Sequence, residues 1–276
     1  SERERRNVKL YLNLASEGLS CLGDHNENIN PKYFNEQKIL RICKRYSDLI
    51  AGLKLRISAE IATDSQTTSF DALRRGIEIA QRCGLPLSVH MPNFQGELSG
   101  LIDILRPGDI FCHVYTPQKG ILEDGSVSEE MKRAVQKGII LESACGKGHF
   151  GHECAGKAIQ AGIEPNIISG DFTKNTHHFE PAVSLPYLMS RFLGLGLSFE
   201  KVLSCCTTEP AKQMGMEGKI GCLKTGAFAN IAVLERRQKD IVFVDVKGKE
   251  VRGNELIIPV MTILEGEPVY RNMSAF

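Results

Sequence analysis

Short strand-like runs alternate with helical segments along most of the chain, and this rhythm constrains the fold more than any other feature. Each run is apolar, and helical period or helix punctuation follows it. The runs are Val8–Leu14, Leu49–Ile57, Leu85–His90, Asp109–His113, Ile139–Ser143 and Asn166–Asp171. Such alternation predicts βαβ units whose strands form a parallel sheet.

Two helices between these runs have recognisable boundaries. In Ser69–Cys83 apolar residues recur at helical spacing, and Gly84 supplies the stop before the next run. Ser126 and Glu129 form an S-x-x-E pattern, which predicts a capping box, and Gly138 is expected to end that helix.

The position of the polar residues favours a barrel over an open doubly wound sheet. No glycine-rich phosphate loop follows any run, since Gly146-x-Gly148 lacks the third glycine. Polar residues collect instead at the carboxyl ends of the strands, where a (β/α)8 barrel carries its catalytic groups. We predict a (β/α)8 TIM barrel over residues 1–217. A closed barrel needs eight strands, so two are unaccounted for.

The pattern changes after residue 217. Short β-type runs separated by turns occupy Ile231–Leu234, Ile241–Asp245 and Leu256–Ile263. They predict a small β subdomain over residues 218–276.

Composition excludes several classes of protein. The chain has 276 residues, and 34 Lys and Arg against 33 Asp and Glu give a net charge of +1 with no basic block, so no nucleic-acid partner is expected. No apolar run reaches the ~18 residues of a membrane helix, so no membrane partner is expected. Nine scattered cysteines without a CxxC motif favour reduced core thiols and a cytoplasmic location.

Four strand residues stand out as candidates for chemistry. His90, His113 and Asp171 each end a run, and Lys54 lies inside the apolar run LIAGLKLRI, where a lysine is costly unless it is paired, modified or coordinating. Two imidazoles and a carboxylate on converging strands favour a metal site, best suited to Zn²⁺. Each residue alone is more often structural, as a rim hydrogen-bonding group, a solvent-reaching lysine or a helix cap. The set of four in this order is what favours the metal site.

These segments together resemble the amidohydrolase superfamily, in particular its dihydroorotase-like amidohydrolase/deacetylase branch. The resemblance rests on GLKLRIS, LPLSVH, GDIFCH and SGD in that order, then on RFLGLGLSFEKVLSCCTTEPAKQMGM and KIGCLKTGAFANIAVLE. It covers essentially the whole chain.

The resemblance implies a (β/α)8 barrel with two divalent metals, usually Zn²⁺, and a small β-sandwich. Lys54, carbamylated (carboxylated) by CO₂ on the fourth strand, would bridge the metals. His90 and His113, ending strands five and six, would bind the second metal. Asp171, ending strand eight, would bind the first metal and handle protons. The barrel over 1–217 would then contain strands three to eight, and 218–276 the C-terminal part of the sandwich.

The chain departs from the family pattern in one major respect. The resemblance implies a His-x-His pair ending strand one, and none occurs here. Three explanations remain: the residues are part of a longer chain, the protein is a metal-poor and catalytically dead relative, or a partner chain supplies the missing strands. We favour the first, because a barrel lacking two strands would leave long unpaired edges.

Three further residues are candidates for substrate binding. Arg56 lies two residues after Lys54 on the same strand face, where it would hold a substrate carboxylate or form a structural ion pair. Cys145 stands where close relatives often carry a Gly-His-Gly motif, and it is either a ligand, a reactive thiol or a small rim residue. His149 lies in the loop after strand seven, either in the pocket or in solvent.

The expected function is a metal-dependent hydrolase of the deacetylase type. A hydroxide shared by the two metals would attack an amide, cyclic amide or ester of a small molecule, with Asp171 as general base. A dihydroorotase-like cyclic amidase is the alternative substrate class, and a non-catalytic amidohydrolase-like scaffold is the alternative kind of protein. A small-molecule substrate and a homo-oligomer are expected.

Overall fold

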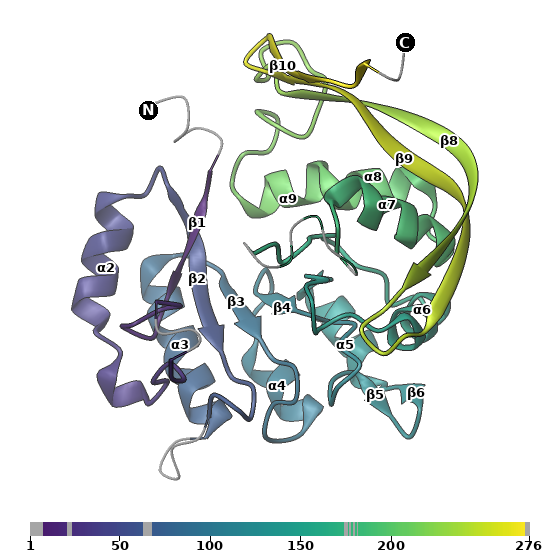
Figure 1. The fold of residues 1–276 in the computed structure, drawn as a ribbon. Coiled ribbons are helices and arrows are strands. Elements are labelled where there is room, and N and C mark those ends of the chain that lie inside the picture. The colour runs from purple at the N-terminus through teal and green to yellow at the C-terminus, as the bar shows by residue number, and fades with distance from the viewer. Residues whose placement is uncertain are drawn as a thin grey trace. The chain divides into compact units, whose positions relative to one another are not determined.

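The computed structural model describes residues 8–20, 24–62, 68–173, 176, 178, 180 and 182–273. The chain divides into two compact units, whose elements are labelled in Figure 1. The first unit comprises Ser1–Val114 and Gln118–Glu142, and the second comprises Tyr115–Pro117 and Ser143–Phe276.

The first unit contains a parallel sheet of five strands among the described residues, in the order β1-β2-β3-β4-β7. The strands are β1 (Leu10–Asn13), β2 (Ile50–Arg56), β3 (Leu87–His90), β4 (Ile110–Cys112) and β7 (Ile140–Glu142). Each lies inside one of the predicted runs, so five of the six predicted strands are confirmed. Because parallel neighbours require crossover connections, helices intervene between them.

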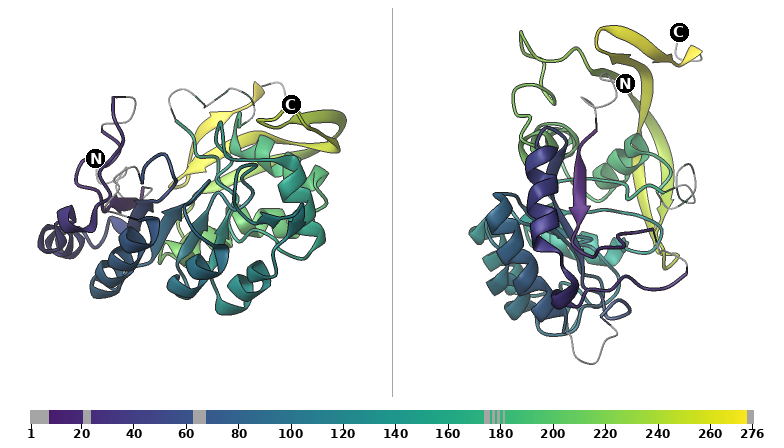
Figure 2. Two further views of the ribbon diagram at one scale, coloured as in Figure 1. Left: turned by 90° about the horizontal axis from the view of Figure 1, so that it is seen from below. Right: turned by 90° about the vertical axis from the view of Figure 1, so that its left-hand side faces the viewer.

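The connecting elements of the first unit follow one another in chain order. They are η1 (Pro31–Tyr33), α2 (Glu36–Arg45), α3 (Ser69–Cys83), α4 (Leu98–Ile104), the short hairpin β5 (Leu122–Glu123) and β6 (Ser126–Val127), and α5 (Glu130–Lys137). Figures 1 and 2 show α2, α3 and α4 side by side on one face of the sheet.

Helix α3 has the bounds that the sequence predicts. Thr68 Oγ1 accepts a hydrogen bond from the Asp71 amide at 3.1 Å, and the Thr68 amide donates to Asp71 Oδ2 at 3.3 Å, which completes a capping box. Gly84 ends the helix at a φ of 66°, a left-handed conformation that glycine adopts without steric cost.

The capping box predicted at Ser126 and Glu129 is wrong. Ser126 lies in β6, where it pairs with Glu123 of β5, and α5 begins only at Glu130. The Glu129 side chain makes no capping hydrogen bond. Tertiary pairing of a short hairpin therefore overrides the local motif, although Gly138 ends the helix as predicted, at a φ of 80°.

One face of the parallel sheet is wholly apolar. Alternate strand residues on this face have no exposed surface, and they include Leu53, Leu55, Leu87, Val89, Phe111 and Leu141. Because strand side chains alternate between faces, the intervening residues lie on the opposite face, and the polar candidates are among them.

The second unit contains four helices in its described part and an antiparallel sheet in the order β10-β9-β8. The elements are α6 (His152–Gln160), α7 (Leu185–Gly194), α8 (Phe199–Cys206), α9 (Thr208–Gln213), β8 (Ile231–Val244), β9 (Glu250–Leu264) and β10 (Glu267–Arg271). Figure 2 shows the long β8–β9 hairpin from two further sides. Helix α7 packs against β9, where Ser190 Oγ accepts a hydrogen bond from the Ile257 amide at 2.8 Å.

The mixed α/β fold with a parallel sheet and a C-terminal antiparallel sheet confirms the predicted class. The three predicted C-terminal runs lie within two long strands, since β8 covers the first two almost completely. The predicted domain boundary after residue 217 stays a prediction.

The sixth predicted run, Asn166–Asp171, forms no regular strand in the described structure, but it hydrogen-bonds to the segment that follows β7. The amides of Ser143 and Cys145 donate to the carbonyls of Ile167 and Ser169, each at 2.9 Å. This spacing of two residues is that of a parallel ladder. The left-handed φ of 46° at Asp171 ends the extended backbone.

Two expectations from composition can be compared with the described residues. In that part of the chain no helix combines the length and the hydropathy that a bilayer crossing requires. Of the eight cysteines that the structure describes, five are buried: Cys43, Cys112, Cys145, Cys154 and Cys205. Cys21 lies outside the described residues.

Candidate functional site

Strand register places the polar candidates of the first unit in two rows on one face of the parallel sheet. Asn13, Lys54 and Ser88 are register partners in the lower row. Arg56 and His90 are register partners one step nearer the carboxyl ends, and Cys112 and Glu142 continue that row. This end of parallel strands is where α/β enzymes carry their chemistry.

Lys54 is half-buried, and its amine has a hydrogen-bond partner on the neighbouring strand. Nζ donates to Ser88 Oγ at 3.2 Å, and the Ser88 side chain is itself buried. The lysine that is unexpected in an apolar run is therefore accommodated on the polar face of β2. Lys54 is also the register partner of Asn13 on β1.

His90 and His113 form a buried imidazole pair. His90 ends β3 and is 6% exposed, and His113 follows β4 and is 3% exposed. Their ring centroids are 4.6 Å apart with an interplanar angle of 80°, and each offers a ligand nitrogen within 4.8 Å of the other. This edge-on arrangement brings both predicted histidine ligands together, as the sequence predicts for neighbouring strand ends.

The backbone at His113 is in the left-handed region, with a φ of 62°. A residue with a Cβ pays a steric cost there, and such strain clusters at functional sites. The unusual backbone turns the chain at the end of β4 directly after Cys112, so that the imidazole lies against His90.

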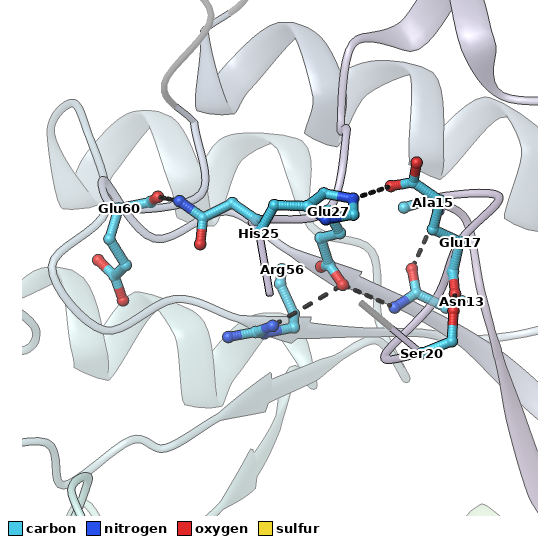
Figure 3. A network of polar contacts seen from close by, with 9 residues as sticks. Asn13, Ala15, Glu17, Ser20, His25, Glu27, Arg56 and Glu60 are labelled. Carbon is cyan, nitrogen blue, oxygen red and sulfur yellow. Dashed lines mark hydrogen bonds and ion pairs between the residues drawn. The ribbon is translucent and has the colours of Figure 1, made fainter. Parts of the chain in front are cut away.

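A buried carboxylate that sequence reasoning missed lies at the same end of the sheet. Glu27 is 3% exposed, its Oε2 accepts a hydrogen bond from Asn13 Nδ2 at 3.3 Å, and Arg56 Nη1 is 3.7 Å from the same oxygen (Figure 3). Oε1 has no hydrogen-bond partner among the described residues. Burial raises the pKa of the Glu27 carboxyl, and Arg56, Asn13 and Lys54 oppose that shift.

No signal in the sequence marks Glu27. It lies in the polar segment Asp24–Asn30, which has neither periodicity nor a motif, and it is far from Arg56 along the chain. Two side-chain contacts attach the segment: Asn26 donates to the Glu60 backbone carbonyl, and Glu27 accepts from Asn13 (Figure 3). Folding therefore delivers this carboxylate to the end of β2.

The second unit carries the remaining predicted residues. Asp171 is exposed and has a φ of 46°, so this predicted ligand too has a left-handed backbone. A Cβ on Gly146 would lie 2.6 Å from Asp171 Oδ2, and the Gly146 amide donates to the Gly170 carbonyl at 2.9 Å. Glycine at position 146 thus leaves the space that the carboxylate occupies.

Cys145 and His149 lie in the loop between β7 and α6. Cys145 has no exposed surface, and its Sγ donates to Ser143 Oγ at 3.6 Å. Its complete burial favours the interpretation of a small structural residue over that of a reactive thiol. His149 is half-buried in the same loop. Their proposed roles in substrate binding stay predictions.

The donor set of the first unit fits a divalent metal of the borderline kind. Two buried imidazoles with ligand nitrogens within 4.8 Å of each other suit Zn²⁺, and the Lys54 amine lies on the same polar face, where it donates to Ser88. Asp171 belongs to the second unit, and its assignment to the same centre rests on the family resemblance.

Comparison with known proteins gives consistent results. A model of the amidohydrolase family matches residues 190–270. A deacetylase of Brucella anthropi is 28% identical over 272 residues, which cover 97% of this chain and 66% of the relative. A deacetylase of Agrobacterium fabrum is also 28% identical over 272 residues, which cover 97% of this chain and 65% of that relative.

Two solved structures are similar over nearly the whole chain. A crystal structure of a dihydroorotase has a TM-score of 0.84 at 27% identity and covers 96% of this chain and 69% of its own. A crystal structure of an adenine deaminase has a TM-score of 0.88 at 21% identity, with 96% and 71% coverage. The chain is thus similar to proteins of the amidohydrolase superfamily in sequence and in fold. The resemblance expected from the strand-end motifs is thereby confirmed, and so is the fold class that it implies.

The similarity does not extend over the full length of these relatives. The chain spans just under two thirds of the two deacetylases. The metal-ligand roles of Lys54, His90, His113 and Asp171 stay predictions for this chain.

Proposed function

We propose that the protein is a metal-dependent hydrolase that cleaves an acyl–nitrogen or acyl–oxygen bond of a small molecule, in the manner of a deacetylase. The observation that carries the proposal is the buried pair of His90 and His113 at the carboxyl ends of neighbouring strands, with Lys54 on the same polar face. The deacetylase names of two relatives support the substrate class.

Each predicted residue has a role in this proposal. His90 and His113 would hold one divalent metal, Lys54 in carbamylated form would bridge it to a second, and Asp171 would bind the second. Bound metals of this kind polarise a carbonyl and lower the pKa of water towards ~7. Asp171 would take a proton from the attacking water and pass it to the leaving amine or alcohol.

The polar row beside the metal residues would orient the substrate. Arg56 is the register partner of His90 and lies on the same face as Lys54, so it is placed to bind a polar group next to the scissile bond. Ser88 would hold the Lys54 tip in place through the hydrogen bond of 3.2 Å. His149 would contribute from its loop.

The proposal is tested by metal content and hydrolysis in the same preparations. Wild-type protein should bind Zn²⁺ and release acetate from O-acetyl or N-acetyl carboxylates. His113→Ala should lose both properties, and His25→Ala, an exposed histidine of the first unit, should lose neither. Wild-type protein that binds no divalent metal and hydrolyses no acyl compound would count against a hydrolase and for a non-catalytic scaffold.

A cyclic amidase is a second candidate, favoured by the likeness to a dihydroorotase structure. The same residues would then open a cyclic amide rather than release a free acyl group. Assays with dihydroorotate and with N-acetyl carboxylates in parallel distinguish the two, because they differ only in which substrate is turned over.

A further inference from the structure

Glu27 has no part in the function proposed above, although few carboxylates in the described residues are as deeply buried. Its only partners there are one amide at 3.3 Å and one guanidinium at 3.7 Å, and both reach the same oxygen. A buried carboxylate that is incompletely paired is costly. Replacing such a pair by apolar residues is often neutral or stabilising, so fold stability by itself does not account for it.

Arg56 keeps most of its hydrogen-bonding capacity. In the described part of the chain Glu27 is its only ionic partner, and its guanidinium has no hydrogen-bond acceptor there. The arginine side chain is 17% exposed, whereas that of Glu27 is 1% exposed. A guanidinium has five donors in a planar fork, so an edge facing Glu27 leaves another edge for a second carboxylate.

The location of Arg56 connects this pair to the candidate site. Its strand position is opposite His90 and two residues beyond Lys54, on the polar face of the sheet. Asn13, the other partner of Glu27, is the register neighbour of Lys54. Glu27 therefore links the ends of β1 and β2 next to the predicted metal residues, as Figure 3 shows for Asn13 and Arg56.

We propose that Glu27 is a positioning residue that holds the Arg56 guanidinium, and that Arg56 so held binds a free carboxylate on the substrate. The inference rests on the proposed function and narrows it to acylated small molecules that carry a carboxylate. Fixing a long side chain before binding removes part of the entropy that binding would otherwise cost. The two-pronged geometry of a guanidinium suits a planar carboxylate.

The test compares two probes that differ only in charge. N-acetylglycine and N-acetylglycinamide are titrated by calorimetry into Zn²⁺-loaded wild type, Arg56→Gln, Glu27→Gln and Glu27→Asp. Wild type should prefer the carboxylate by about tenfold or more, as a charge-assisted bidentate contact predicts. Arg56→Gln and Glu27→Gln should both lose most of that preference, and Glu27→Asp, which keeps the charge but shortens the side chain, should lose part of it.

A matched control and a kinetic readout separate positioning from a structural role. Glu17→Gln removes an exposed carboxylate that follows β1 in the chain and should keep the preference. Where N-acetylglycine is hydrolysed, Glu27→Gln should raise KM by about tenfold and change kcat little, because Arg56 binds a part of the substrate that does not react. Thermal denaturation confirms that each variant is folded.

The outcomes distinguish this inference from the proposed function. Wild type without the preference, or Glu27→Gln that retains it, overturns the inference, and so does failure of N-acetylglycine to bind. Preference without hydrolysis supports the inference and counts against the hydrolase. Hydrolysis of both probes with equal kcat/KM supports the hydrolase and overturns the inference.

Discussion

The parallel sheet of the first unit has a buried carboxylate at each end, and the two differ in how many hydrogen bonds they accept. At the amino end, Asp109 is 1% exposed and both of its oxygens are saturated. It accepts from the Leu87 amide at 2.8 Å, from the Arg106 amide at 2.7 Å and from the Arg106 guanidinium at 3.0 and 2.7 Å. At the carboxyl end, Glu27 has one hydrogen bond and one long ion pair.

This difference suggests different roles for the two carboxylates: Asp109 stabilises the fold, and Glu27 belongs to the candidate site. A saturated carboxylate locks two strand starts together and has no capacity left for a ligand. The incompletely paired Glu27 contacts Arg56 and leaves that guanidinium with donors for a ligand, at a cost in stability. In barrels of this class the amino end serves stability and the carboxyl end serves catalysis, and the two carboxylates follow that division.

Removing Asp109 should produce the largest effect on stability. In Asp109→Ala, the buried Leu87 amide and the Arg106 guanidinium lose their acceptor, and we expect a loss of about 3 kcal/mol in the free energy of unfolding. Urea denaturation measures it. Asp103→Ala removes an exposed partner of Arg133 and should change stability by less than about 0.5 kcal/mol. Equal losses in both variants would contradict the special role of the amino end.

Removing a histidine at the carboxyl end should impair metal binding rather than folding. His90→Ala is expected to weaken Zn²⁺ binding by at least about a hundredfold, since the loss of a direct ligand exceeds that of an outer-shell partner. Competition with a chromophoric chelator measures the affinity. Wild-type affinity in His90→Ala would remove His90 from the metal site.

The second unit offers a related test at two glycines of one loop. Gly146→Ala places a Cβ 2.6 Å from Asp171 Oδ2 at a φ of 47°, so it should displace the carboxylate and cost about 1–2 kcal/mol of backbone strain. Gly148→Ala meets nothing within 4 Å. Activity and thermal denaturation of the pair measure the difference. Identical behaviour would show that the Asp171 position does not depend on Gly146.

The smallest expected effect is a pH dependence at Glu27. Burial raises the pKa of this carboxyl in the folded state, so its contribution to stability is complete below the ordinary value of 4.5 and is lost as the pH rises through the raised value. Glu27→Gln lacks this titration. The unfolding free energy of the variant minus that of wild type should therefore increase as the pH rises above the ordinary value of 4.5. A constant difference across this range would show that the pair with Arg56 compensates fully for burial.

Local signals account for the features of the fold that could be predicted. Alternating apolar runs identified five strands, and apolar period with a glycine stop identified α3, because burial on one face imposes these patterns directly. The capping box at Ser126 failed because hairpin pairing with Glu123 competes with it, and pairing is not a local property. Asn166–Asp171 pairs with the preceding segment, but the left-handed Asp171 ends it without a regular strand.

The same distinction between local signals and non-local packing applies to the candidate site. The amino-acid sequence alone places Lys54 within β2 and His90 and His113 at strand ends, because a residue's place in a strand is read from its neighbours in the chain. That the His90 and His113 rings pack edge-on with centroids 4.6 Å apart, and that Glu27 reaches Arg56, follows from the three-dimensional packing. The physical reason is that register between strands, and the path of an irregular segment, are set by packing between residues that are distant in the chain.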